Sequence, residues 1–460
     1  MGRIFGTDGV RGVANTELSC KLAMNLARAS AMIIAERLGR APVILVGKDT
    51  RISSDMLEAA VAAGLSSVGA HALLAGVLPT PAVSSLIAQG HADGGVMLSA
   101  SHNSYEFNGV KIFGPGGHKL SDAEEFEIES IVLDKTKPYT VRWGGDLGRI
   151  SQAQNLSEHY ISRVVEAAEG RLAGIKVAID CSNGSACATA EKIFSRLGAD
   201  ATFIANQPDG VNINRECGST HMSGLMETVR AGGYHVGIAF DGDADRCLAV
   251  DETGAYVDGD QIMAIFATDM RARGILKDNA IVATVMSNLG LAKFAEANGF
   301  SLVQTKVGDR YVLEEMRKCG YTLGGEQSGH IILPRHIGTG DGQLTAVMLL
   351  SILARSGKKL SELACAMQVY PQAIVNIRAD ALMKSKLDVD QGALRIIEEA
   401  KAALGNEGRI LVRPSGTEPL IRVMIEGKDK AEITALIERT AEQLKERLSS
   451  NEDHKRLEGF

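Results

Sequence analysis

Three aspartates at alternate positions form the most specific chemical pattern in the sequence. Asp241, Asp243 and Asp245 directly follow the apolar run VGIAF, and Arg246 comes next. Carboxylates this close together repel one another unless a cation lies between them. Hard oxygen ligands select Mg²⁺, Mn²⁺ or Ca²⁺ over zinc. The pattern therefore predicts a divalent-metal loop, and a solvated acidic turn is the weaker interpretation.

An EF-hand is a second kind of metal loop with this spacing of acidic residues. Glu252 falls at the twelfth position of such a loop, but Arg246 stands at the sixth, where an EF-hand needs glycine. The flanking residues also have the composition of strands rather than helices. We therefore favour a strand-bounded metal loop over an EF-hand.

A serine-containing loop, SASHN at 99–103, follows the apolar strand predicted at 94–98. Ligand sites in open α/β sheets lie beyond the carboxyl ends of strands. Ser101 is therefore a candidate nucleophile or phosphate carrier. A turn or helix-capping serine is the plainer interpretation of this segment taken alone. The chain lacks a GxSxG elbow here, which weakens a hydrolase interpretation.

Phosphate-binding chemistry is indicated by the segment RPSGTEP at 413–419, between two strand-like runs. Arginine presents a fork of donors that matches a phosphate, and serine and threonine hydroxyls beside a glycine add further donors. A hairpin loop that happens to carry an arginine is the alternative. The candidate ligands are Arg413, Ser415, Gly416, Thr417 and, further along, Arg422.

Sugar-binding chemistry is indicated by GGEQSGH at 324–330, where Glu326 and Ser328 offer hydrogen bonds to hydroxyl groups. His330 is suited to proton transfer near neutral pH. A plain glycine-rich turn fits this segment equally well in isolation. Two cations, Arg11 in GTDGVRG and Lys111 in NGVKIF, also stand beside glycines.

Short β-branched runs alternate with Ala/Leu/Glu-rich stretches through most of the chain, which predicts α/β domains with mainly parallel sheets. Strands are expected at 42–47, 71–76, 94–100, 176–180, 202–205, 236–240, 280–285 and 301–305. Helices are expected at 52–69, 188–197, 260–273, 289–298 and 428–448. The apolar run 346–353 is too short to span a bilayer and predicts a buried helix.

Three strand–helix cycles and a differently patterned tail predict four domains. We expect three α/β domains followed by a smaller α+β domain, with a polar, flexible end to the chain. The expected bounds are 1–155 for the domain with the serine loop, 156–255 for the metal loop, 256–370 for the sugar loop, 371–450 for the phosphate loop, and 451–460 for the tail.

Composition narrows the class of protein. Apolar residues make up 45% of the 460 residues and charged residues 23%, which excludes a largely disordered chain. The net charge of −7 gives no support for a nucleic-acid or membrane partner. Seven scattered cysteines and an N-terminus without a signal-peptide pattern favour the reducing cytoplasm. We expect a small molecule as the partner; the oligomeric state stays open.

Taken together, the motifs resemble those of the α-D-phosphohexomutase superfamily. FGTDGVRG, SASHN, DGDADR, GGEQSGH and RPSGTEP stand in the superfamily's order and spacing, over essentially the whole chain. Gln327 in the sugar loop and NINRECGSTH at 212–221 are similar to the glucosamine branch. Ser104 replaces the proline that usually follows ASHN, which loosens the loop but leaves Ser101 in place.

The resemblance implies a heart-shaped molecule of three α/β domains with mixed, mostly parallel sheets and a C-terminal α+β domain, around a central cleft. It implies that Ser101 is a phosphoserine and binds Mg²⁺ together with Asp241, Asp243 and Asp245. Lys111 and His330 would be the general acid and base, and the resemblance does not say which is which; Arg11 and Arg246 would lie nearby. Glu326 and Ser328 would recognise the sugar. The non-reacting phosphate would be bound by Arg413, Ser415, Gly416, Thr417 and Arg422.

The implied activity is that of an isomerase that interconverts glucosamine 6-phosphate and glucosamine 1-phosphate. The reaction would pass through a sugar 1,6-bisphosphate, which also serves as activator, and would feed the synthesis of UDP-N-acetylglucosamine for the cell wall. Two alternatives stay open: the same reaction on glucose or mannose phosphates, and a non-catalytic sugar-phosphate sensor. The intact Ser101 and the three aspartates weigh against the sensor, because a binding protein needs no nucleophile.

Overall fold

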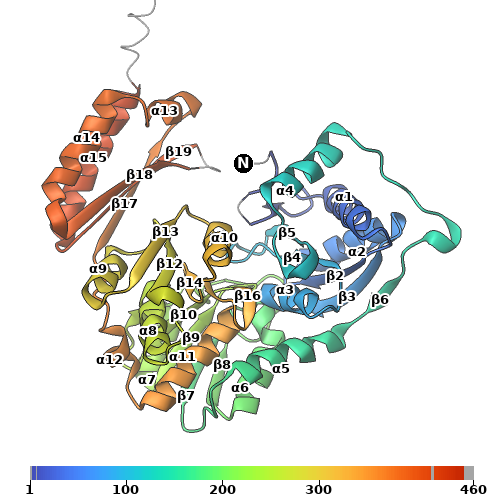
Figure 1. The fold of residues 1–460 in the computed structure, drawn as a ribbon, viewed down its shortest axis with the longest axis horizontal. Helices are drawn as coiled ribbons and strands as arrows, with labels where there is room; N and C mark the ends of the chain where they lie inside the picture. The colour runs from blue at the N-terminus through green and yellow to red at the C-terminus, as the bar shows by residue number, and fades with distance from the viewer. Residues whose placement is uncertain (1–2, 7, 416–418, 450–460) are drawn as a thin grey trace, which may run out of the picture. The chain divides into compact units, whose positions relative to one another are not determined.

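The computed structural model describes residues 3–6, 8–415 and 419–449. They form two compact units, which we describe separately (Figure 1). The first unit comprises the chain up to residue 287 together with 295–366, and the second comprises 288–294 and the chain from 367 onward. Helix α9 (Leu289–Asn298) begins in the second unit and ends in the first.

The first unit begins with a six-stranded mixed sheet. Its central strands are parallel, whereas β1 and β5 at one side run antiparallel to their neighbours. The strand order is β1 (Val10–Val13), β5 (Phe107–Phe113), β4 (Gly94–Leu98), β2 (Val43–Lys48), β3 (His71–Val77), β6 (Ile150–Gln152). The first helices are α1 (Cys20–Leu38), α2 (Ile52–Ser67), α3 (Thr80–Ala88) and α4 (Asp122–Glu129).

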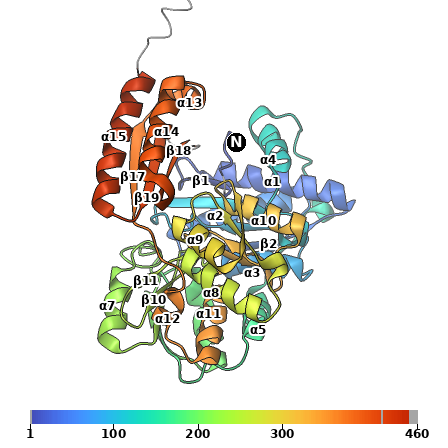
Figure 2. The ribbon, with the colours of Figure 1, turned by 60° about the vertical axis from the view of Figure 1, so that its left-hand side comes forward.

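Local sequence explains where the long first helix, α1, begins and ends. Figure 2 shows this helix along its length. Ser19 caps α1 by accepting the backbone N–H of Leu22, and Gly39 ends it with a φ of 67°, which glycine adopts without strain. Buried Leu26 and Ile33 of α1 join buried Leu57 of α2 in the core of this part. The helices thereby cover the sheet that carries the serine loop.

Two five-stranded sheets complete the first unit, and each again combines parallel and antiparallel pairs. One has the order β11 (Tyr256–Val257), β10 (Cys247–Asp251), β9 (Val236–Phe240), β7 (Lys176–Asp180), β8 (Asp200–Ile204), with α5 (Ser157–Ala167), α6 (Ala190–Leu197) and α7 (Ser223–Gly232). The other has the order β13 (Ser301–Thr305), β12 (Ala280–Thr284), β14 (Gly324–Gly325), β15 (Ile331–Leu333), β16 (Ile337–Gly340), with α8 (Gly259–Ala272), α10 (Asp309–Cys319), α11 (Gly342–Ser356) and α12 (Leu360–Ala364).

The second unit has the α+β character that the tail of the sequence predicts. Its three strands are antiparallel in the order β17 (Gln372–Arg378), β19 (Leu420–Gly427), β18 (Gly408–Pro414). Helices α13 (Ala381–Lys386), α14 (Gln391–Leu404) and α15 (Lys430–Ser449) accompany them. Ile433, Ile437 and Leu444 form the buried stripe of α15, at the spacing that makes a helix amphipathic.

The predicted strand–helix alternation agrees with the structure, and the added antiparallel strands have a simple cause. Residues 99–106 join β4 to β5, 241–246 join β9 to β10, and 326–330 join β14 to β15. A parallel pair needs a crossover of about a dozen residues or more, so these short connections force antiparallel pairing. The serine, metal and sugar motifs therefore occupy equivalent hairpin loops in three successive sheets.

The apolar run at 346–353 lies inside α11, as predicted, where Leu349 and Leu350 are fully buried. In the part of the chain that the structure describes, no helix has both the length and the apolar character needed to cross a membrane.

Candidate active site

Four of the sequence motifs meet in the first unit. The Ser101 hydroxyl donates to Asp241 Oδ2 at 2.5 Å, which joins the serine loop to the metal loop. Lys111 Nζ lies 2.7 Å from Asp243 Oδ2, and His330 Nδ1 lies 3.7 Å from Asp245 Oδ1. The serine, the three aspartates and both general acid/base candidates are thus neighbours.

Ser101 is held in an uncommon backbone conformation. Its φ is 52°, in the left-handed region that residues other than glycine rarely adopt, and the residue is 1% exposed. The Ser101 N–H donates to Ser99 Oγ at 2.9 Å, and the Ser99 hydroxyl donates to Asp49 at 2.6 Å. Backbone conformations of this kind persist where surrounding contacts impose them, and they concentrate at functional sites.

A buried arginine supplies much of that constraint. The Arg51 guanidinium is closed to solvent and pairs with Asp49 at 2.8 Å. It donates to the carbonyl oxygens of Ser101 at 3.0 Å and Asn103 at 2.8 Å, and also to those of Ser104 and Phe107. Asn214 donates to the Ser101 carbonyl as well, at 2.8 Å. Arg51 and Asn214 therefore both hold the backbone of the serine loop in place.

The metal loop has the arrangement expected of a divalent-cation site. One oxygen from each of Asp241, Asp243 and Asp245 lies within 4.8 Å of the others, and all three residues are buried. Oδ1 of Asp243 and Oδ1 of Asp245 are buried without a hydrogen-bond partner among the described residues. Burial and the two neighbouring carboxylates raise the pKa of Asp241 well above its usual range. Unpaired carboxylate oxygens around one point suit a hard cation.

Lysine and arginine offset the remaining carboxylate charge. Lys111 is 2% exposed and contacts Asp243 and Asp8, both at 2.7 Å. Burial disfavours its charged form, but Asp243 and Asp8 outweigh burial and raise the pKa of Lys111, so this side chain is an ammonium group here. Arg11 donates to Asp8 at 2.5 Å and to Asn103 Oδ1 at 3.1 Å, which places it beside the serine loop.

His330 lies between two carboxylates, Asp245 and Asp309, and is 4% exposed. Burial lowers the pKa of His330, but the two carboxylates raise it to about 9, so the ring carries a proton at neutral pH. The backbone N–H of Arg246 donates to Asp241 Oδ1 at 3.2 Å, and the neighbouring carboxylates hold the pKa of the Arg246 side chain above its ordinary value despite burial.

The sugar loop presents two side chains with spare hydrogen-bonding capacity. Glu326 accepts the backbone N–H of Gly308 at 3.2 Å, and burial raises the pKa of its carboxyl group. Ser328 Oγ is buried and has no hydrogen-bond partner among the described residues. Both groups lie on the hairpin that ends at His330, so the loop brings a carboxylate acceptor and a hydroxyl group to one place.

The predicted phosphate ligands of the second unit lie on its central hairpin. Arg413 on β18 is the register partner of Arg422 on β19. Burial and the Arg422 charge both lower the pKa of Arg413, and Arg413 Nε is buried without a hydrogen bond to the described residues. Two opposed guanidinium groups suit an anion. Ser415 ends the described part of this loop, and Gly416 and Thr417 lie outside the described residues.

Several residues of the site escaped the sequence analysis, chiefly Asp8, Asp49, Arg51, Lys119, Asn214 and Asp309. Asp309 had a usable signal, because it follows the strand at 301–305 and ligands collect beyond strand ends. Asp8 stands inside the quoted motif GTDGVRG. Arg51 follows the strand expected at 42–47, and Asn214 stands inside the quoted segment NINRECGSTH, but neither position reveals their contacts with a loop that is distant in sequence.

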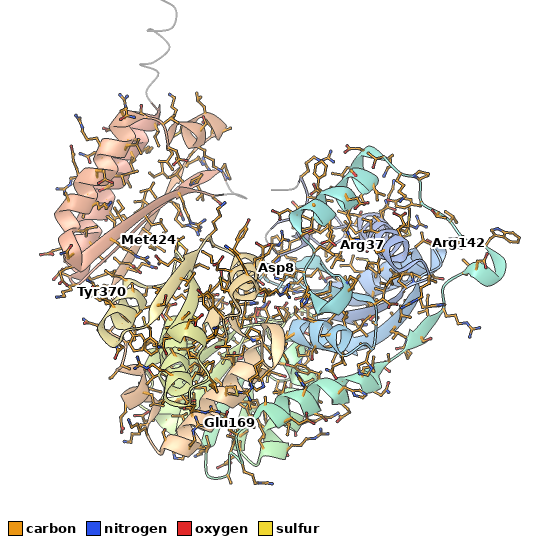
Figure 3. The ribbon with its side chains drawn as sticks, viewed as in Figure 1. Asp8, Arg37, Arg142, Glu169, Tyr370 and Met424 are labelled. Carbon is orange, nitrogen blue, oxygen red and sulfur yellow. The ribbon has the colours of Figure 1, made fainter. Side chains whose placement is uncertain are left out.

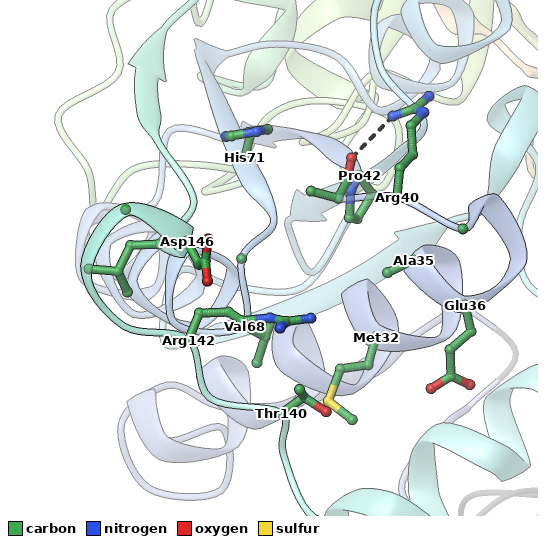
Figure 4. Close-up of a pocket in the computed structure, with 15 residues that line it drawn as sticks. Met32, Ala35, Glu36, Arg40, Pro42, Val68, His71, Thr140, Arg142 and Asp146 are labelled. Atoms are coloured by element: carbon green, nitrogen blue, oxygen red, sulfur yellow. Dashed lines mark hydrogen bonds between the residues drawn. The ribbon is translucent and has the colours of Figure 1, made fainter.

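A separate pocket of about 530 Å³ lies in the N-terminal part of the first unit (Figure 4). Met32, His71, Arg142 and Asp146 are among its lining residues, and Arg40 donates to the Ala41 carbonyl at 3.1 Å at its edge. None of the residues predicted from the motifs lines it, so we do not include it in the site.

Comparison with known families matches all four parts of the chain. The matching models describe the domains of phosphoglucomutase/phosphomannomutase enzymes. Domain I matches residues 2–139, domain II 158–254, domain III 258–370 and the C-terminal domain 374–443.

Curated relatives are similar over nearly their whole length. A phosphoglucosamine mutase of Acetivibrio thermocellus is 53% identical over 94% of this chain and 96% of its own. A phosphoglucosamine mutase of Ruminiclostridium cellulolyticum is 51% identical over 98% of this chain and 100% of its own.

Solved structures share the fold. A phosphoglucomutase/phosphomannomutase family protein of Burkholderia thailandensis has a TM-score of 0.81 at 24% identity, covering 97% of this chain and 98% of its own. N-acetylphosphoglucosamine mutase of Aspergillus fumigatus, solved with GlcNAc-6P and magnesium, has a TM-score of 0.67 at 17% identity, covering 96% and 95%.

Proposed function

We propose that this chain, which belongs to the phosphoglucomutase/phosphomannomutase family, interconverts glucosamine 6-phosphate and glucosamine 1-phosphate. The observation that carries the proposal is the Ser101 hydroxyl, 2.5 Å from a carboxylate of the buried aspartate cluster. The choice of sugar is supported by the relatives named phosphoglucosamine mutase, which are half identical to this chain over nearly its full length. The product would serve the synthesis of UDP-N-acetylglucosamine.

Ser101 carries the phosphoryl group between the two ends of the sugar. Phospho-Ser101 gives its group to the free hydroxyl of the bound sugar phosphate: the Ser Oγ–P bond breaks, a sugar O–P bond forms, and the hydroxyl proton passes to a base. The resulting 1,6-bisphosphate turns round in the site. Ser101 then accepts the phosphoryl group from the other end, and the sugar leaves as the isomeric monophosphate.

Asp241, Asp243 and Asp245 would hold Mg²⁺ together with an oxygen of phospho-Ser101. Bound there, the ion supplies positive charge that offsets the charge of the transferring group. The Lys111 ammonium and Arg11 add fixed positive charge beside the serine loop from the protein itself. Because these groups are already in place, they need no reorganisation during the reaction.

Proton transfer falls to Lys111 or His330, both of which lie against the aspartate cluster. Both hold a proton in the present arrangement, which suits them to act first as acids and to exchange protons once the local charge changes. Glu326 and Ser328 would hydrogen-bond the sugar hydroxyls and fix its orientation.

The second unit would bind the phosphate that is not reacting. Arg413 and Arg422 supply the charge, and Ser415, Gly416 and Thr417 would add hydrogen-bond donors. Long, multiply donating side chains suit this task, because the same groups must accept the substrate in two orientations.

The test is a parallel assay of wild-type protein and Ser101→Ala with glucosamine, glucose and mannose phosphates, in Mg²⁺ with catalytic sugar 1,6-bisphosphate. We expect the highest kcat/KM for the glucosamine phosphates and no turnover by the variant. Ser104→Ala, an exposed serine of the same loop, is the matched control. A preference for glucose or mannose would assign another mutase activity. Binding without turnover by the wild type would assign a sensor.

A further inference from the structure

A second lysine, Lys119, lies between Asp8 and Asp309, two acidic residues of the site that the sequence analysis did not predict. Lys119 Nζ is 2.6 Å from Asp8 Oδ1 and 2.7 Å from Asp309 Oδ2. The side chains of Lys119 and Asp309 are only 12% and 13% exposed, so solvent screens the pair little. Asp8 lies in the part of the molecule where α10 approaches the N-terminal sheet (Figure 3).

Each of these carboxylates also touches a general acid/base candidate. Asp8 Oδ2 lies 2.7 Å from Lys111 Nζ, and Asp309 Oδ2 lies 3.3 Å from His330 Nε2. Lys119 is therefore the middle member of a continuous series of charged contacts that runs from Lys111 to His330. It joins the groups on the first sheet to the groups on the third.

The backbone fixes both ends of this bridge. Lys119 follows a tight loop in which Gly117 packs so closely on Ser84 that an added Cβ would lie 2.1 Å from the Ser84 carbonyl oxygen. Lys119 itself pairs with Phe113 in a β-bridge. Asp309 is the first residue of α10, directly after the Gly308 whose N–H donates to Glu326.

Further ion pairs hold α10 against the same segment. Arg310 pairs with Asp122 and Glu125 of α4, and Arg317 contacts His118. These contacts keep α10 in place when Lys119 alone is changed. The effect of Lys119 on its two carboxylates is thereby separable from the docking of the helix.

We propose that Lys119 is a positioning residue for the phosphoryl-transfer site: by bridging Asp8 and Asp309 it fixes Lys111 and His330 against the aspartate cluster. Without it, two partly buried carboxylates face one another with no cation between them and move apart, and each carries with it the catalytic group that it contacts. Displacements of about 1 Å reduce rates by up to roughly a hundredfold. The proposal rests on the proposed function for its choice of substrate.

The first test compares Lys119→Met with Lys137→Met, which removes an exposed lysine that pairs with Glu36 at the surface. We expect kcat with glucosamine 6-phosphate to fall roughly ten- to a hundredfold in Lys119→Met, with KM changed by less than about threefold. The control should keep kcat within about twofold of wild type. A Lys119→Met variant with wild-type kcat overturns the proposal.

Rescue and coupling distinguish positioning from general damage to the fold. Lys119→Arg, which can still bridge two carboxylates, should recover most of the lost kcat. Asp309→Asn, in which the side chain keeps nearly the same shape, should by itself lower kcat. The double variant Lys119→Met with Asp309→Asn should have a kcat little lower than that of either single variant. An arginine variant as slow as the methionine variant, or fully additive losses, contradicts the bridge.

A second readout separates this proposal from the choice of sugar. The rate at which glucose 1,6-bisphosphate phosphorylates Ser101, followed by intact mass, should fall in Lys119→Met and recover in Lys119→Arg. A wild-type protein that phosphorylates Ser101 but does not turn over glucosamine phosphates refutes the proposed substrate and leaves this comparison intact. Equal phosphorylation rates in wild type and Lys119→Met refute the positioning role.

Discussion

Charged side chains in the site are closely matched in number. The carboxylates are Asp8, Asp241, Asp243, Asp245 and Asp309, and the cationic groups around them are Arg11, Lys111, Lys119, Arg246 and protonated His330. A divalent cation and a doubly charged phosphoserine arriving together leave this balance unchanged. Such matching explains how these groups remain together in a largely buried place once a bound cation keeps Asp241, whose pKa is raised, in its charged form.

Lys111 contacts three carboxylates, those of Asp8, Asp243 and Asp245, so its removal should lower both stability and activity. In Lys111→Met, buried carboxylates lose their partner, and we expect the free energy of unfolding to fall by about 3 kcal/mol in urea titrations. Added Mg²⁺ should restore more stability in this variant than in wild type, because the ion offsets the same carboxylates. Turnover should fall at least about a hundredfold.

Lys137→Met serves again as the exposed control. A Lys111→Met variant whose stability equals that of the control would show that the contacts with Asp8 and Asp243 contribute nothing to the folded state.

Residues that react were easier to predict from the sequence than residues that hold them. Ser101 and the three aspartates stand in short motifs at strand ends, and the residue types and spacing of these motifs indicate their chemistry. Arg51 and Asn214 donate to backbone carbonyls of the serine loop, which is far from them in the chain, and Asp49 accepts from Ser99 of that loop and from Arg51. No local sequence pattern reveals the partner of such a residue, because the packing of whole domains brings the two together.

Among the elements, the short hairpin loops determine the architecture of the site. The sequence predicted the central parallel strands from their apolar runs and strands on both sides of the metal loop, but it did not predict that the strand after each motif pairs antiparallel with the strand before it. Each of those strands exists because only a few residues separate it from its predecessor, as with 241–246 between β9 and β10. The motif residues were known from the sequence, while the pairing that aligns them required the structure.

Helix α11 offers a prediction about pH at this scale. Asp341 caps it by accepting the Leu344 N–H at 2.9 Å, and Tyr160 donates to the same buried carboxyl group. Burial raises the pKa of Asp341 to about 7. Between the ordinary pKa near 4 and pH 7, the unfolded chain gives up this proton while the folded chain keeps it. Folding stability from this group therefore falls as the pH rises through that interval.

Asp341→Asn removes the titration and keeps a good helix cap. We expect the free energy of unfolding, measured in urea with a metal chelator from pH 4 to pH 8, to decline less steeply with pH in the variant than in wild type. Parallel pH profiles for the two proteins would contradict a raised pKa at Asp341.

At the scale of the whole molecule, the chemistry is divided between two compact units. The first unit holds the serine, the aspartate cluster and the sugar loop, and the second holds the opposed Arg413 and Arg422. The sequence predicts four domains, the last from residue 371 onward, whereas the chain divides into two compact units, of which the second includes the chain from Met367. It could not anticipate that residues 288–294 join the second unit, where buried Glu426 accepts from Asn288 and from the Leu289 N–H.

Arg413→Ala tests whether the second unit binds the non-reacting phosphate. Loss of a charged contact should lower kcat/KM for glucosamine 6-phosphate by about 2 kcal/mol, or roughly thirtyfold. Arg395→Ala, which removes an exposed arginine from α14 of the same unit, is the control and should behave as wild type. An unchanged kcat/KM in Arg413→Ala would remove this arginine from substrate binding.

The central claim is that Ser101 carries the transferred phosphoryl group, and the most direct test follows the phosphorylation of Ser101 during the reaction. Purified protein is phosphorylated with sugar 1,6-bisphosphate, and its intact mass and phosphopeptides are followed after glucosamine 6-phosphate is added with Mg²⁺. We predict about 80 Da of added mass at Ser101, lost to the sugar at a rate no slower than kcat and absent from Ser101→Ala. Phosphate on another residue, or transfer from Ser101 far slower than turnover, would contradict the account.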